Sequence, residues 1–114
     1  MIKRIKVKER MTGRELASML SRSHLKWNNN AVIQREKDGR MSYCMIGQIA
    51  KHAGVKDETL QRKGVGNAPI VIAEMNDSNK TKAECVETFC NYRGEFRVKD
   101  WIDEMLQWQK DRVD

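Results

Sequence analysis

Apolar residues recur three and four positions apart in several segments of the chain, which is the spacing of one face of an α-helix. Residues 12–22 begin with Thr12 and Glu15, whose spacing predicts a capping box, and continue with apolar residues at helical spacing. A second capping box, Thr81 with Glu84, begins another such segment. The pattern therefore predicts helices that start near these two threonines.

Glycines mark the expected ends of two helices. A helix that begins near Ser42 is expected to end at Gly54, because glycine adopts the left-handed conformation that closes many helices. The helix that begins at Thr81 is expected to end at Gly94 for the same reason. The buried stripes of these two helices are predicted to be Ile46, Ile49, Ala50 and Ala53 in the first, and Val86, Phe89 and Cys90 in the second.

A last helix is expected from Asp100, a residue suited to capping a helix. Trp101, Met105 and Trp108 follow on one face of it. Such a stripe is more often core than interface, but tryptophan is enriched in binding hot spots. These three residues are therefore a candidate protein interface, either for a second copy of this chain or for another protein.

Three short segments have the composition of strands. Residues 2–8 alternate between apolar residues and lysines, which predicts an edge strand, and residues 31–36 predict a second strand closed by a turn at 37–40. The apolar run 70–72 fits a strand or a helical turn, and its β-branched residues favour a strand. We expect an α+β fold in a single domain, residues 1–114, with a small sheet of about three short strands covered by three to four helices.

Charge is distributed unevenly along the chain of 114 residues, whose net charge is +6. Residues 1–63 contain 15 Lys or Arg and 6 Asp or Glu, whereas residues 64–114 contain 7 and 10. A positive field raises the association rate with acidic partners, including phosphates and nucleic acids, although a solvated surface without a partner has the same composition. The predicted basic face consists of Lys3, Arg4, Lys6, Lys8, Arg10, Arg14, Arg35, Lys37 and Arg40.

The sequence argues against several classes of protein. It has no apolar run long enough to span a membrane, and its first residues are charged where a signal peptide would be apolar. We therefore expect a cytoplasmic protein with reduced cysteines and no membrane partner. Aromatic residues make up 6%, and no zinc finger or RNA-recognition signature is present. Nucleic-acid binding would then be limited to the phosphate backbone, without sequence preference.

Cys44 is the strongest single candidate for chemistry. It lies at the start of a predicted helix, where free amides lower the pKa of a thiol. A cysteine-dependent enzyme would also need a base, and His52 lies about 12 Å further along the same helix; the other interpretation is a buried thiol beside Gly47. Asn76 and Asp77 are expected to form a polar turn before the next helix. Cys44, Asn76 and Asp77 together are a candidate ligand site, and no metal or cofactor is expected because the ligands are too few.

Several of these residues also form a pattern. A cysteine stands three positions before a glycine at a helix start, an asparagine-aspartate pair precedes a threonine-capped helix, and a tryptophan follows the first helix. In these features the chain resembles a family of small bacteriophage and actinobacterial proteins that is catalogued as a domain of unknown function. The resemblance covers roughly residues 12–91 and departs from the family pattern at Gln48 and Met75. It implies a phage or prophage origin and no mechanism. The matching residues are Trp27, Cys44, Gly47, Asn76, Asp77 and Thr81.

The function that we expect is a small non-enzymatic binding protein, phage-encoded, that engages an acidic macromolecule or a phosphate-bearing ligand of the host. A host protein or nucleoprotein complex would be the partner, and inhibition of a host defence system would be the outcome. Two alternatives stay open: a cysteine-dependent enzyme that uses Cys44, and a non-specific nucleic-acid-binding accessory protein. A homo-oligomer formed through the C-terminal helix is a further expectation.

Overall fold

The structure is a computed structural model that describes residues 8–78 and 81–112. Of the described residues, 54% are helical and 13% are in strands. The elements in chain order are β1 (Arg10–Thr12), α1 (Gly13–Arg22), β2 (Lys26–Trp27), β3 (Gln34–Arg35), β4 (Met41–Tyr43), α2 (Met45–His52), α3 (Asp57–Arg62), α4 (Ile70–Ser78), α5 (Lys82–Asn91), β5 (Glu95–Arg97) and α6 (Lys99–Asp111).

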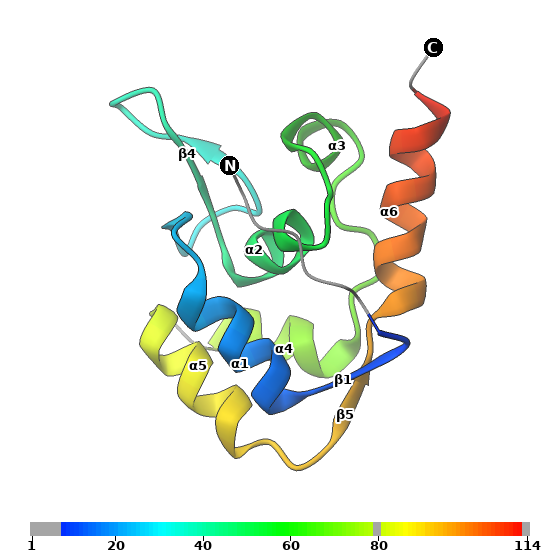
Figure 1. Ribbon diagram of the computed structural model, residues 1–114. Helices are drawn as coiled ribbons and strands as arrows, with labels where there is room; N and C mark the ends of the chain where they lie inside the picture. The colour runs from blue at the N-terminus through cyan, green and yellow to red at the C-terminus, as the bar shows by residue number, and fades with distance from the viewer. Residues whose placement is uncertain (1–7, 79–80, 113–114) are drawn as a thin grey trace.

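The predicted α+β class is confirmed, with the strands divided between two small sheets (Figure 1). One sheet is the antiparallel pair β1–β5. The other has the order β2-β4-β3, in which β2 is parallel and β3 antiparallel to β4. Helix α2 lies at the centre, α1 and α5 lie beside each other at one end, and α6 runs along one side (Figure 1). Among the described residues, no helix is both long and apolar enough to cross a membrane.

Both predicted capping boxes are present, and they begin α1 and α5. The Thr12 hydroxyl accepts a hydrogen bond from the Glu15 amide at 3.1 Å, and the Thr12 amide donates to the Glu15 carboxylate at 3.0 Å. The two helices pack closely because Gly13 has no side chain. A Cβ atom there would lie 2.1 Å from the carbonyl oxygen of Phe89, a distance that no real contact allows.

Helix α2 ends as its sequence predicts, with Gly54 in the left-handed region at a φ of 100°. It begins later than expected, at Met45, because residues 41–43 pair as the central strand β4. Gly47 permits a second close approach, since a Cβ atom there would lie 2.1 Å from the Val32 carbonyl oxygen. Residues 31–33 therefore run against α2, and only Gln34–Arg35 of the predicted strand 31–36 forms strand β3.

The expectation of a strand at 70–72 is wrong, because this segment begins helix α4. The Ala73 amide donates to the Pro69 carbonyl at 3.0 Å. Ile70 is 76% exposed whereas Ile72 is fully buried, and side chains two positions apart lie on opposite sides of a helix but on the same side of a strand. Burial of one apolar side chain by the core outweighs the strand preference of β-branched residues. Helix α4 continues to Ser78, so Asn76 and Asp77, predicted to form a polar turn, are helical as well.

Other predictions of detail are corrected at the ends of the helices. Helix α5 ends at Asn91 with Tyr92 as an extended cap, three residues before the predicted Gly94. Cys90 is exposed, because the buried side of α5 runs through Cys85 and Phe89, which lie one helical turn apart. The residue that caps α6 is Val98, and Asp100 lies in the first turn. Residues 2–7 of the strand predicted at 2–8 lie outside the described residues, and Lys8 is not part of a strand.

Candidate anion-binding site

Pairing of β1 with β5 places two arginines directly opposite each other. In this pairing Arg10 lies opposite Arg97, and the next residue, Met11, lies opposite Phe96. Met11 and Phe96 are buried, and successive side chains of a strand point to opposite faces. Arg10 and Arg97 are exposed and therefore share the outer face of this ladder. Like charges at opposed positions of a sheet repel each other, which makes the pair costly unless an anion lies between them.

The same outer face continues into a pocket of about 530 Å³. Thr12 and Glu95, the next outward pair of the ladder, line this pocket together with the first turn of α1 and the turn that joins α5 to β5. Two arginines from these segments, Arg14 and Arg93, line it as well. We call it the arginine pocket, and its lining residues are Thr12, Arg14, Cys90, Asn91, Tyr92, Arg93, Gly94 and Glu95.

Four arginines thus gather at one end of the molecule, and we call Arg10, Arg14, Arg93 and Arg97 the arginine face. All four are exposed, and none of them forms an ion pair with a carboxylate among the described residues. The neighbouring Lys8 is paired with Glu15, with 2.6 Å between Nζ and Oε2, and this contact lowers the pKa of the Glu15 carboxyl. The arginine face therefore keeps its positive charge, with Glu95 as the one carboxylate that lines its pocket.

The structure divides the basic face that was predicted from the sequence. Lys8, Arg10 and Arg14 lie at the arginine face, and Lys3, Arg4 and Lys6 lie outside the described residues. The other three lie at the hairpin of β3 and β4, Arg35 at the end of β3 and Lys37 and Arg40 in the turn that follows, away from β1 (Figure 1). Arg93 and Arg97 were missed, because they come from the half of the chain with a net negative charge. Only the pairing of β5 with β1 brings them beside Arg10 and Arg14.

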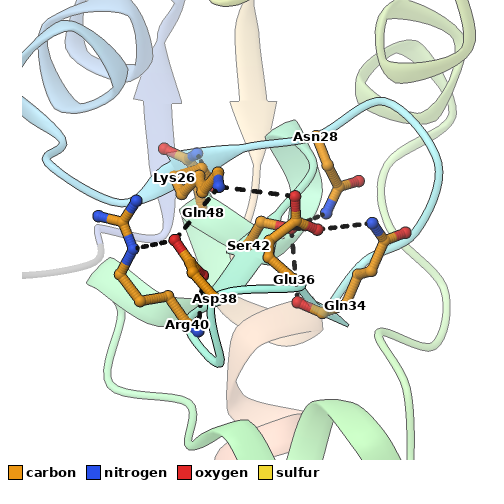
Figure 2. A network of polar contacts seen from close by, with 8 residues as sticks. All are labelled: Lys26, Asn28, Gln34, Glu36, Asp38, Arg40, Ser42 and Gln48. Atoms are coloured by element: carbon orange, nitrogen blue, oxygen red, sulfur yellow. Dashed lines mark hydrogen bonds and ion pairs between the residues drawn. The ribbon is translucent and has the colours of Figure 1, made fainter.

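Two carboxylates, Glu36 and Asp38, offset part of the positive charge around the β3–β4 turn, as Figure 2 shows. Arg40 Nε lies 2.9 Å from Asp38 Oδ2, and Lys26 lies between the carboxylates of Glu36 and Asp38, at 3.7 and 3.8 Å. Arg35 donates to the Gly39 carbonyl at 3.0 Å. This turn is therefore a weaker anion-binding surface than the arginine face.

A buried polar network lies beneath that turn. Glu36 Oε2 accepts hydrogen bonds from the side-chain amide of Gln34 at 2.6 Å and from the Ser42 hydroxyl at 3.0 Å (Figure 2). The two bonds hold the pKa of the Glu36 carboxyl below its usual value. The side-chain amide of Asn28 donates to the Ser42 hydroxyl at 2.8 Å. The side-chain amide of the fully buried Gln48 donates to backbone carbonyls of β2, of β4 and of the residue before β2. These bonds account for the three-stranded sheet, whose strands are too short to be stable alone.

The predicted ligand residues Cys44, Asn76 and Asp77 do come together, in a smaller pocket of about 260 Å³ that Asn29 and Asn30 also line. Burial raises the pKa of the Cys44 thiol and outweighs the hydrogen bonds that would lower it. The expectation that the helix start activates this cysteine is therefore wrong. Cys44 is 6% exposed and caps α2, as the interpretation of a buried thiol requires.

The stripe on α6 belongs mainly to the core. Trp101 and Met105 are 4% and 0% exposed, and the Trp101 indole donates to the Val65 carbonyl at 2.6 Å. The prediction of an interface is therefore wrong for these two residues, because their side chains pack within the chain. Trp108 is half-buried, with the guanidinium of Arg112 4.7 Å from the centroid of its indole ring. An interface at Trp108 stays a prediction.

Comparison with protein-family models, with curated proteins and with solved structures finds no significant match for this chain. Among the described residues, no group of three or more His, Cys, Asp or Glu is arranged to hold a metal ion.

Proposed function

We propose that this is a non-enzymatic binding protein that binds a phosphate-bearing ligand through the arginine face. The observation that carries the proposal is the opposition of Arg10 and Arg97 on one exposed face. Two like charges at opposed positions destabilise a ladder, and a bound anion removes that cost. A surface that keeps two like charges opposite each other in the unbound state is suited to an anionic ligand.

The chemistry of arginine favours phosphate as that anion. The guanidinium group is planar and matches two oxygens of a phosphate at once, and it is weakly hydrated. The four cations on the arginine face are all arginines, and two of them, Arg14 and Arg93, line a pocket into which a phosphate group can enter. Carboxylates have the same bidentate geometry, so an acidic protein is the competing ligand in the test below.

A phage origin, a host partner and inhibition of a host defence system remain part of the proposal, and they rest on the family resemblance. A non-specific nucleic-acid-binding protein would use the same face. The alternative of a cysteine-dependent enzyme has less support, because burial raises the pKa of the Cys44 thiol.

The test compares two double variants that remove the same charge from different places. Arg10→Ala with Arg97→Ala changes the arginine face, and Arg35→Ala with Lys37→Ala changes the β3–β4 turn. We expect inorganic polyphosphate to bind the first variant about tenfold or more weakly than the wild type, as for the loss of one charge-assisted hydrogen bond or more, and the second nearly as well as the wild type.

Poly-L-glutamate serves as the anion without phosphate, and thermal melts verify that both variants fold. Stronger binding of polyphosphate than of poly-L-glutamate supports the proposal. Equal losses in the two variants would show a diffuse charge effect and overturn the assignment to the arginine face. Equal binding of the two polymers would overturn the preference for phosphate.

A further inference from the structure

We infer that the ligand of the arginine pocket is a nucleoside monophosphate. This inference rests on the proposed function and names the ligand class of the same site. The pocket has a volume of about 530 Å³, which lies in the range of small-molecule sites, about 300 to 1,000 Å³. A phosphate group alone would leave most of it to solvent. The residues that line it include two arginines, an aromatic ring, a side-chain amide and a carboxylate, which are the groups that bind the parts of a nucleotide.

The phosphate group is bound by Arg14 and Arg93. Both arginines line the pocket and form no ion pair with the described carboxylates. Thr12 adds a hydroxyl group, whose oxygen already accepts from the Glu15 amide at 3.1 Å, so its proton is left to donate to a phosphate oxygen. Arg10 and Arg97 on the adjoining ladder add to the positive potential.

The base is bound at Tyr92. This half-buried side chain lines the pocket and stacks on Phe96, with ring centroids 4.6 Å apart and an interplanar angle of 26°. Gly94 makes room for the ring, because a Cβ atom at that position would lie 2.7 Å from Tyr92 Cε1. Asn91 lines the same pocket with an amide that both donates and accepts, as the edge of a base does.

Glu95 decides between a nucleotide and a simple polyanion. Glu95 lines the pocket, and a carboxylate there favours a ligand with a single phosphate group over a longer chain of phosphates, which it repels more strongly. It accepts hydrogen bonds from ribose hydroxyl groups, which is how acidic residues bind the ribose in many nucleotide sites. A pocket with two arginines, one aromatic ring and one carboxylate therefore fits the three parts of a nucleotide.

The experiment measures binding of the four ribonucleoside monophosphates one at a time by calorimetry, with adenosine and inorganic phosphate as partial ligands. We expect at least one nucleotide to bind about tenfold or more tightly than either partial ligand. Arg93→Ala should weaken nucleotide and phosphate binding but leave adenosine unchanged. Tyr92→Leu should weaken nucleotide and adenosine binding but leave phosphate unchanged. Arg35→Ala, in the distant β3–β4 turn, is the control for loss of charge.

Glu95→Gln provides a test that does not depend on the packing of Tyr92, because Glu95 is exposed. It should weaken binding of the ribonucleotide and leave the 2′-deoxynucleotide unchanged. Equal effects on the two sugars would overturn the role of Glu95. Binding of polyphosphate without binding of any mononucleotide would overturn this inference and leave the proposed function intact. Failure of every phosphate-bearing probe to bind would overturn both.

Discussion

Gln109 Oε1 lies 2.9 Å from the hydroxyl oxygen of Thr59, and this contact joins the C-terminal helix α6 to α3. The same oxygen accepts a hydrogen bond from the backbone amide of Lys56 at 2.7 Å. The side-chain amide of Gln109 donates to the Gly54 carbonyl at 3.2 Å. One side chain thus satisfies three polar groups at the point where α2 ends and α3 begins. It holds the last turns of α6 beside α3, along one side of the molecule (Figure 1).

Gln109→Ala is expected to destabilise the protein by about 1 to 3 kcal/mol, because it leaves partly buried polar groups without their partner. The measurement is the free energy of unfolding from urea titration. Gln107→Ala is the matched control on the same helix, since the exposed Gln107 side chain bonds within α6, to Asp111 at 2.9 Å, and to no other described residue. A loss of the same size in both variants would show that the three contacts of Gln109 add nothing.

The two tryptophans of α6 are expected to respond differently to truncation. Trp101→Ala removes a buried side chain and its hydrogen bond to Val65, and should cost about 3 to 5 kcal/mol. Trp108→Ala removes a half-buried ring and its contact with Arg112, and should cost only about 1 kcal/mol. Thermal melts measure both, and sedimentation of the wild type and of Trp108→Ala tests the predicted interface. A dimer that persists in Trp108→Ala would contradict a role of this residue in self-association.

Thiol labelling with iodoacetamide near neutral pH should modify Cys90 first. Cys90 is exposed, whereas Cys44 and Cys85 are buried, and burial raises the pKa of Cys44 and raises that of Cys85 to about 11. Peptide mass mapping after short labelling identifies the modified residue. In a Cys90→Ser variant the remaining thiols should react quickly only after denaturation. Labelling of Cys44 as fast as that of Cys90 in the native protein would contradict this prediction and would favour the alternative of a cysteine-dependent enzyme.

Acidification should weaken the network around Glu36. The pKa of this carboxyl is lowered in the folded state by hydrogen bonds from Gln34 and Ser42. Its contribution to stability is therefore complete above its unfolded pKa, and is lost as the pH falls through the lowered folded value. The urea midpoint of the wild type should fall more between about pH 6 and about pH 3 than that of Glu36→Gln. Glu74→Gln, at an exposed position on α4, should behave as the wild type does.

Local signals in the sequence determined where α1 and α5 begin and where α2 ends. Thr12 with Glu15 and Thr81 with Glu84 satisfy amides within one turn of chain, so these contacts form wherever the helix lies in the fold. The left-handed Gly54 ends α2 for an equally local reason. The α+β class follows from the alternation of such helices with short extended segments.

Tertiary structure decided the features that depend on contacts between distant residues. Residues 70–72 have a local preference for a strand, but they begin helix α4, in which Ile72 is buried in the core. Burial of Cys44 removes the activation that its place at a helix start predicts, because desolvation outweighs the nearby amides. The arginine face exists only because β5 pairs with β1 and sets Arg97 opposite Arg10. The spacing of apolar residues along the sequence does not predict this pairing, because its register is fixed by the burial of Met11 and Phe96 on the other side of the ladder.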